Sequence, residues 1–186
     1  SVSGFAALLM ENFPLYDTPL IADIITSSGN RGADGLVDRQ YGWGVLQMDV
    51  ALNGPRALRG TRNVNVGAGD VDTWTHNIVN ANTLYVADIQ RQHTDHIGGL
   101  NKYGGGELIL TGRSTFSANS TVYEGLLTVN GELTASDISV AHRGILGGTG
   151  RLADVNVLTN GVLAPGSSAD PYGTLTVNGN LDLDAG

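Results

Sequence analysis

The feature that most constrains the fold is a pattern that the sequence uses twice, at an offset of 17 residues. The two stretches are ISVAHRGILGG and VNVLTNGVLAP, and each has two β-branched residues two apart, then a glycine and a leucine. A heptapeptide also recurs, as LTVNGEL at 127–133 and LTVNGNL at 175–181. Repetition on this scale is typical of a chain wound into stacked, similar coils. The matched residues of the longer pattern are Ile138, Val140, Gly144 and Leu146, then Val155, Val157, Gly161 and Leu163.

The repeats predict a mainly β fold, a right-handed parallel β-helix (β-solenoid). A short strand cannot bury its inward side chains alone, whereas stacked coils place valine on valine and leucine on leucine. Both heptapeptides are therefore expected on inward-facing rungs of one stack, with glycine and asparagine at the corners. A glycine-rich β-sandwich stays open as an alternative, but it gives no reason to reuse the heptapeptide. The sandwich stays open because the spacing between equivalent glycines of the repeats is irregular, at 13, 17 and 18 residues. These glycines are Gly131, Gly144, Gly161 and Gly179.

Composition supports short strands and excludes several classes of function. Glycine supplies 27 of the 186 residues, about twice the usual share, as expected for many tight turns. The chain has 10 basic residues and a net charge of −8, which argues against nucleic-acid binding. It has no cysteine, so disulfides and thiolate metal sites are excluded. The apolar run at 5–10 lacks a basic flank and is followed by polar residues and proline, so it does not resemble a signal peptide.

Residues 1–56 are predicted to be helices and loops. A first helix is expected from about Val2 to Asn12, because Pro14 disfavours its continuation. A second is expected to begin with Thr18 as N-cap and Pro19 in its first turn, and a short third helix is expected over 45–52. From about residue 63 the pattern alternates with period two. It predicts strands around Val64 and Val66, Leu84 and Val86, and Leu108 and Leu110.

The N-terminal part resembles one known family. SVSGFAALL is similar to the segment just after the nucleophilic serine of subtilisin-like proteases, where the pattern is G-T-S-x-A-x-P-x-V-S-G-x-x-A-L-L. Residues 2–4 and 7–9 fit the second half of that pattern. The expected helix at Thr18 and the stretch VDRQYGWGVLQMDVAL, at 37–52, resemble the elements that follow in the same domain.

The later part is similar to the passenger-associated β-strand repeats of autotransporters. Residues 100–116 look like their L-x-K-x-G-x-G-x-L-x-L-x-G-x-x-T-[YF] unit. GILGGTGRL and GVLAPGSSADPYGTLTVNGNL match what commonly follows that unit. Tyr103 and Glu107 depart from the pattern, but neither side chain has to point inward. The two resemblances cover most of the chain, and residues 61–99 only weakly.

Together the resemblances imply a subtilisin-like serine endopeptidase secreted as an autotransporter across a Gram-negative outer membrane to the cell surface. They imply three segments: residues 1–56 as the α-helical C-terminal tail of the protease domain, 57–105 as a β-rich junction, and 106–186 as solenoid repeats. The implied partners are the upstream catalytic domain, a downstream translocator β-barrel and the protein substrates of the parent protease. No cofactor is expected.

The same comparison implies that the chain is a fragment without catalytic residues. The family's Asp and His would lie far upstream, and its nucleophile five residues before Ser1. Ser1 and Ser3 are not expected to act as nucleophiles, since no base and orienting acid lie near them in the sequence. The first helix would have packed against the protease core. Its apolar face is therefore expected to pack on the solenoid or a second copy, or to promote aggregation.

The densest ionisable cluster is QRQHTDHIGG, which holds His93, Asp95 and His96. A His-x-x-His pair could chelate zinc if both ring nitrogens converged, with Asp95 or Asp88 as a further oxygen ligand. The segment is predicted to be a loop, which leaves this geometry open. Solvated loop histidines, without a metal, are the expected state.

Three other surfaces are explained better by structure than by binding. Asp70 and Asp72 share a face if their segment is extended and could hold calcium, but they lack the EF-hand spacing. The loop at 164–173, APGSSADPYG, is of a kind that often carries binding sites, yet it matches a structural turn of the repeat family. Packing at the end of the protease domain is preferred over a carbohydrate-stacking surface for the aromatic residues Tyr41, Trp43 and Trp74.

The chain itself is therefore expected to serve as the structural stalk of a passenger. The alternative is an adhesin-like module that binds host glycans or proteins through exposed aromatic residues, for which Phe116, Tyr123 and Tyr172 are available. A third hypothesis, a polysaccharide-cleaving β-helix enzyme, needs carboxylates in phase on consecutive coils. The carboxylates available are dispersed, at Glu107, Glu124, Glu132, Asp137 and Asp154.

Overall fold

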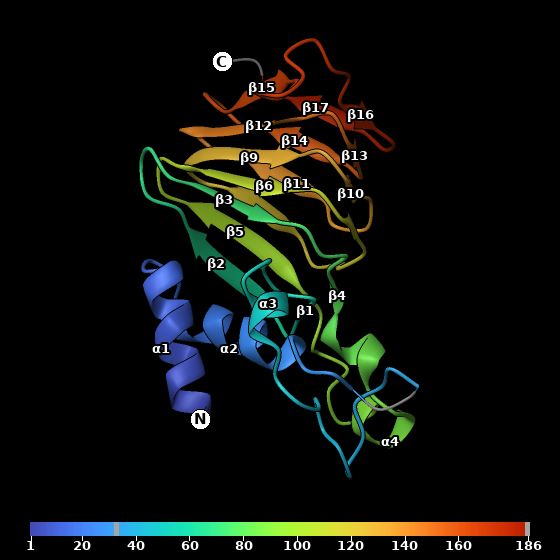
Figure 1. Cartoon of the computed structure of the whole chain (residues 1–186). Coiled ribbons are helices and arrows are strands. Elements are labelled where there is room, and N and C mark those ends of the chain that lie inside the picture. Colours follow the sequence, from blue (N-terminus) through green and yellow to red (C-terminus); the bar gives the residue numbers. More distant parts are fainter. Residues whose placement is uncertain (32–33, 185–186) are drawn as a thin grey trace.

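The computed structural model describes residues 1–31 and 34–184, and shows helices at one end of a tall stack of strands (Figure 1). The strands climb the stack in sequence order, away from the helices. The helices are α1 (Val2–Asn12), α2 (Thr18–Ser27), α3 (Met48–Ala51) and α4 (Ala87–Gln90), with a 3-10 turn, η1 (Ala81–Leu84), before α4.

Three parallel sheets run along the stack, and each turn of the chain visits them in succession. The first sheet has the order β17 (Leu181–Leu183), β14 (Val155–Val157), β11 (Ile138–Val140), β8 (Ser120–Val122), β5 (Gly99–Tyr103) and β2 (Thr61–Asn65). The second has β15 (Val162–Pro165), β12 (Gly144–Gly148), β9 (Gly125–Val129), β6 (Glu107–Leu110) and β3 (Val71–Trp74). The third has β16 (Thr176–Val177), β13 (Arg151–Leu152), β10 (Glu132–Leu133) and β7 (Arg113–Ser114). A separate parallel pair joins β1 (Ala57–Leu58) to β4 (Val79–Asn80).

This arrangement is a parallel β-solenoid, as the repeats predict. All pairings between these strands are parallel, whereas a β-sandwich is built from antiparallel sheets. The 17-residue offset is one coil of the solenoid. Its register partners are Ile138 with Val155, Val140 with Val157, and Leu146 with Leu163.

The core consists of rows of equivalent side chains from successive coils. Leu108, Leu127 and Leu146 lie in register in the second sheet, and each is at most 1% exposed. Val122 and Val140 form a similar buried row in the first sheet. Burying a leucine or valine contributes roughly 1.5–3 kcal/mol relative to leaving it exposed. Stacking can therefore stabilise this cysteine-free chain.

Glycines stand where successive coils approach most closely. A Cβ on Gly131 would lie 2.1 Å from the carbonyl oxygen of Gly112, and a Cβ on Gly150 would lie 2.0 Å from that of Gly131. No side chain fits at such separations. This column of glycines sets the corner between the second and third sheets.

The two heptapeptides lie in the same stack but not on matching rungs. The first runs from the second sheet into the third, and the second runs from the third sheet into the first. Val177 lies in register with Leu152, which in turn lies in register with Leu133. Val177 is the third residue of the second copy, whereas Leu133 is the seventh residue of the first copy, so the two copies are out of phase. Leu181 pairs in register with buried Val155, so it lies on the inward row as expected, and it is 44% exposed because β17 is the last strand of its sheet. The extra residues between β15 and β16 shift the second copy along its coil.

Three local predictions also differ from the structure. Leu84 and Val86 do not lie in a strand, because the chain leaves the stack here and contacts Val37 through backbone hydrogen bonds. The N-cap of α2 is Asp17 rather than Thr18, since its carboxylate accepts the amide hydrogen of Leu20. The third helix is shorter than the predicted 45–52. Helix α1 and the strands around residues 64 and 108 form as predicted.

Helices α1 and α2 cover the N-terminal end of the solenoid, and one apolar core runs through both parts. Leu20 and Ile24 of α2 are fully buried in the same cluster as Val64 and Trp74 of the first coil. Within the segment 57–105, strands β2, β3 and β5 pair in register with one another or with later coils. The sheets therefore start at residue 61.

Helix α1 packs with only one side. Leu9 and Phe13 are buried against the core, whereas Val2, Leu8 and Met10 are about half exposed or more. The helix packs against α2, and Leu9 joins the core that α2 shares with the first coil of the solenoid. None of the helices in the described ranges is long and apolar enough to cross a membrane.

Candidate functional site

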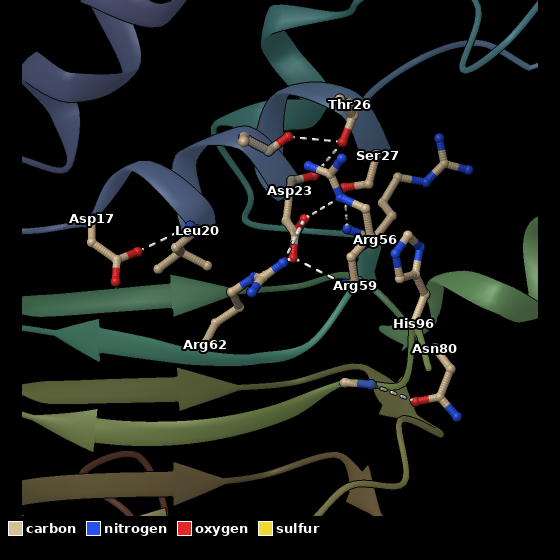
Figure 2. A network of polar contacts seen from close by, with 12 residues as sticks. Asp17, Leu20, Asp23, Thr26, Ser27, Arg56, Arg59, Arg62, Asn80 and His96 are labelled. Carbon is tan, nitrogen blue, oxygen red and sulfur yellow. Dashed lines mark hydrogen bonds and ion pairs between the residues drawn. The ribbon is translucent and has the colours of Figure 1, made fainter. Parts of the chain in front are cut away.

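The most elaborate polar site joins α2 to the first coil of the solenoid (Figure 2). The Asp23 side chain is fully buried and forms ion pairs with Arg59 Nε at 2.6 Å and Arg62 Nε at 2.7 Å. It also accepts the backbone amide hydrogen of Arg59 at 3.0 Å. The two arginine side chains are 27% and 20% exposed, so both are largely withdrawn from water. A charged helix residue is thereby bonded to the chain entering β2.

Neighbouring residues extend this joint along the end of α2. Ser27 Oγ accepts the amide hydrogen of Arg56 at 2.9 Å, and Ser28 Oγ accepts that of Gln47. Each buried polar group on this face of the helix has a partner in the segment that leads to β2. Since unpartnered buried polar groups are costly, these contacts favour a single position of α2 on the solenoid.

A buried lysine lies inside the first sheet. Lys102 follows Val64 and precedes Val122 in the inward row, and it has no exposed surface. Its ammonium group donates to the carbonyl oxygens of Tyr103 and Gly104 at 2.8 Å and of Glu124 at 3.1 Å. Burial lowers the pKa of Lys102 to about 8. This lysine therefore ties together the turns of two successive coils.

The histidine cluster converges, which the sequence left open. His93, Asp95 and His96 each offer one ligand atom within 4.8 Å of the other two. The imidazole rings of His93 and His96 are stacked, with centroids 4.4 Å apart. Asp88, the other oxygen ligand considered, pairs instead with Arg39 at 2.7 Å.

The predicted acidic pair has a different role. Tyr16 Oη donates to Asp72 Oδ2 at 2.6 Å, and Trp74 Nε1 donates to Tyr16 Oη at 3.1 Å. Burial raises the pKa of Asp72. Asp70 is exposed nearby, beside a cavity of about 340 Å³ that separates α1 from the β2–β3 turn. No third acidic or histidine side chain joins Asp70 and Asp72 at ligand spacing within residues 1–31 and 34–184.

The serines and aromatic residues singled out in the sequence are dispersed. Ser1 is the N-cap of α1, and Ser3 is exposed on the same helix. Trp74 is fully buried in β3, so it cannot stack on a sugar. Trp43 packs edge-on against Tyr85, with ring centroids 5.8 Å apart, and Tyr41 is exposed. The loop 164–173 is closed by an isolated bridge between Gly148 and Gly166 and by a turn from Ser167 to Asp170.

The residues considered for glycan binding or cleavage do not gather either. Phe116 is fully buried, so its assignment to an exposed aromatic face is wrong. Tyr123 stacks on Tyr103 with centroids 4.8 Å apart, while Tyr172 is 98% exposed. The carboxylates mostly have individual structural partners. Glu107 accepts from Thr128, Glu124 pairs with Arg143, Glu132 pairs with Arg113, Asp154 accepts from Asn180, and Asp137 is exposed.

Two functional features were missed in the sequence, although each had a signal. Asp23 lies three residues after Leu20 and one before Ile24, so it interrupts the apolar face of α2. Lys102 lies two residues after Leu100 in an alternating segment, which places it on the inward side. A charge on a buried face indicates a specific partner, but the partner's identity requires the fold.

No protein-family model matches the chain. It is similar, however, to parts of several larger curated proteins. It is 27% identical over 206 residues to an extracellular serine protease of Serratia marcescens, covering all of this chain and 19% of the relative. It is 30% identical over 186 residues to the autotransporter lipoprotein NalP of Neisseria meningitidis serogroup B, covering 98% of this chain and 16% of the relative.

The chain is homologous to segments of an extracellular serine protease and of autotransporters. A third relative, the adhesin BmaC autotransporter of Brucella suis, is 36% identical over 154 residues, which are 73% of this chain and 4% of that protein. The chain thus spans less than a fifth of the length of each of these relatives.

Proposed function

We propose that the chain is a passenger segment of a subtilisin-like serine endopeptidase autotransporter, and that its solenoid is a structural stalk. Residues 1–56 would be the C-terminal tail of the peptidase domain, 57–105 the β-rich junction, which already contains the solenoid strands β2, β3 and β5, and 106–186 the later solenoid repeats. Similarity to an extracellular serine protease along the whole chain supports this assignment. So does the opening motif, in which residues 2–4 and 7–9 resemble the helix after the nucleophilic serine.

The observation that carries the stalk role is the joint at Asp23. A stalk has to hold the domain at its end in a fixed position, and a flexible linker would not need buried ion pairs. Here the helical part and the solenoid share one apolar core and a fully bonded polar contact. Stacked coils with the same register then continue the rigid body away from the helices.

The remaining parts of the parent protein would act around this stalk. A translocator domain of the same chain would bring the passenger across the outer membrane of a Gram-negative bacterium to the cell surface. The upstream catalytic domain would cleave protein substrates. The names of the relatives, an extracellular protease and autotransporters, support this location. The purified chain should have no peptidase activity, and casein turnover blocked by a serine-directed inhibitor would contradict that.

Surface display tests the stalk role. The chain is fused to an autotransporter translocator in a Gram-negative host, and exposed passenger is measured by antibody labelling and resistance to added protease. Val140→Asp puts a charge into the buried row, whereas Ser139→Asp changes the neighbouring, outward side chain of the same strand. We expect wild type and Ser139→Asp to be displayed in a protease-resistant form and Val140→Asp to be lost or degraded. Equal display of the two variants would contradict a role for the stacked core.

A second candidate function, an adhesin-like binding module, rests on the similarity to the Brucella adhesin. Tyr103, at the end of β5, stacks on Tyr123, just after β8 in the neighbouring coil, and Tyr123 is 40% exposed while Tyr103 is half-buried. A glycan array probed with the chain and with Tyr123→Ala tests this function. Saturable binding lost in the variant would favour it, and an array without hits would exclude the glycan form.

A further inference from the structure

The turn between α4 and β5 brings three ligating side chains together on the surface of the junction. His93 and His96 are half-buried and Asp95 is exposed, and their ligand atoms lie within 4.8 Å of one another. We propose that His93, Asp95 and His96 bind a Zn²⁺ ion. This site lies outside the stalk and is independent of the peptidase assignment.

The turn is held in place by groups other than the ligands themselves. Asn82 donates its backbone amide hydrogen to the carbonyl of His96 and its side-chain amide to the carbonyl of Thr94, both at 3.1 Å. Within the turn, the amide of His96 donates to the carbonyl of His93, also at 3.1 Å. A backbone fixed in this way reduces the conformational entropy that a metal ion would have to overcome.

Tyr85 orients the His96 ring for binding. Its hydroxyl lies 2.8 Å from His96 Nδ1, and its ring lies edge-on to both imidazoles with centroids 5.7 Å away. When Nδ1 carries the proton and donates to this hydroxyl, Nε2 has a free lone pair. Metal-binding histidines commonly have their second nitrogen held by such a partner, which fixes the tautomer. Tyr85 is itself buried, so packing around its ring holds this hydroxyl beside His96.

The charges also suit a divalent cation near neutral pH. Asp95 adds one negative charge. The positive charge of Arg59, which acts on His96, is matched by Asp23.

The donor set favours a transition-metal ion such as Zn²⁺ over Ca²⁺ and Mg²⁺. Two imidazole nitrogens with one carboxylate suit Zn²⁺, whereas Ca²⁺ and Mg²⁺ prefer oxygen ligands alone. Tetrahedral coordination at roughly 2.0 Å per bond separates ligand atoms by about 3.3 Å. The imidazole rings are stacked with an interplanar angle of 19°, so at least one ring has to rotate before both nitrogen lone pairs point at one ion. Water would fill the fourth position. The bound ion would cross-link the turn at residues 93–96, because all three ligands lie within it.

Isothermal titration of the purified chain with ZnCl₂ at pH 7.5 tests the site. We expect one equivalent to bind, with affinity at least 10-fold lower in His96→Ala and in His93→Ala. Tyr85→Phe, which keeps the ligands but removes the orienting hydroxyl, should also weaken binding measurably. His142→Ala is the matched control, because His142 is exposed on a distant turn of the solenoid, and its affinity should equal that of wild type.

A measurement on wild-type protein guards against variants that misfold. In imidazole ¹⁵N–¹H correlation spectra, added Zn²⁺ should shift the signals of His93 and His96 and leave those of His76 and His142 in place. The proposal is overturned if wild type shows no saturable binding at one equivalent. It is equally overturned if binding persists in the His93→Ala/His96→Ala variant, or if the shifted signals belong to the other two histidines.

Discussion

Replacing Asp23 with asparagine removes one charge from the joint between α2 and the solenoid and keeps the shape of the side chain. Asp23→Asn leaves Arg59 and Arg62 without their counter-charge, although the amide oxygen can still accept one hydrogen bond. Removing one partner of a buried ion pair costs about 3–5 kcal/mol. Both arginines retain some exposure, at 27% and 20%, and can turn partly toward water. We therefore expect the free energy of unfolding to fall by about 2–4 kcal/mol, somewhat less than for a completely buried pair.

The chain offers a matched control for this variant. Asp88 also pairs with an arginine, Arg39, at the same distance of 2.7 Å, but both side chains are exposed. Exposed pairs are weak because solvent and salt screen them. Thermal unfolding followed by circular dichroism should show Asp23→Asn melting about 5–15 °C below wild type, and Asp88→Asn melting with wild type. Equal shifts in the two variants would refute the reasoning, since burial rather than ion-pair distance is taken to decide the effect.

Three further variants test the core, the corners and the buried lysine. Leu127→Ala should lower the free energy of unfolding in urea by about 2–5 kcal/mol, whereas the outward neighbour Leu126→Ala should lower it much less; similar losses would contradict the inward row. Gly131→Ala should be strongly destabilising and Gly105→Ala mild, because only the former places a Cβ 2.1 Å from a backbone oxygen; a tolerated Gly131→Ala would disprove the close approach. For Lys102 the folded pKa, about 8, is below its ordinary value of 10.5, so the unfolded chain binds more protons between these values and stability rises with pH. Wild type should therefore gain stability relative to Lys102→Met from pH 8 to 10.5, by up to about 1.4 kcal/mol per pH unit, and a flat difference would contradict the lowered pKa.

The solenoid could be predicted from the sequence wherever successive coils have no insertion. Between residues 138 and 163 two coils of equal length put β-branched residues and leucines in phase, so a local comparison of sequences reveals a contact in space. The heptapeptide misled for the opposite reason. It marks a strand, a tight turn and another strand, a unit that suits more than one corner of the coil. The extra residues after β15 then move the second copy to a different corner.

The site could not be predicted to the same extent, because its contacts join distant parts of the chain. The sequence shows that Asp23 lies on an apolar helix face, but not that Arg59 and Arg62 lie against it. The histidine cluster illustrates a second limit. Spacing alone brings His93 near His96, whereas the convergence depends on hydrogen bonds from Asn82 and Tyr85, which lie in a segment whose predicted strand is absent.

Disulfide trapping tests the stacked register most directly, and the chain has no native cysteine to interfere. Ser139 pairs in register with Thr121 in the coil before it and with Asn156 in the coil after it. Adjacent strands are about 4.8 Å apart, within reach of a disulfide, whereas Thr121 and Asn156 are two strands apart at about 9.6 Å and out of reach. Mild oxidation should cross-link the cysteine pairs 121/139 and 139/156 in high yield and leave the pair 121/156 reduced. Cross-linking of 121/156, or failure of both neighbouring pairs, would contradict a solenoid in this register.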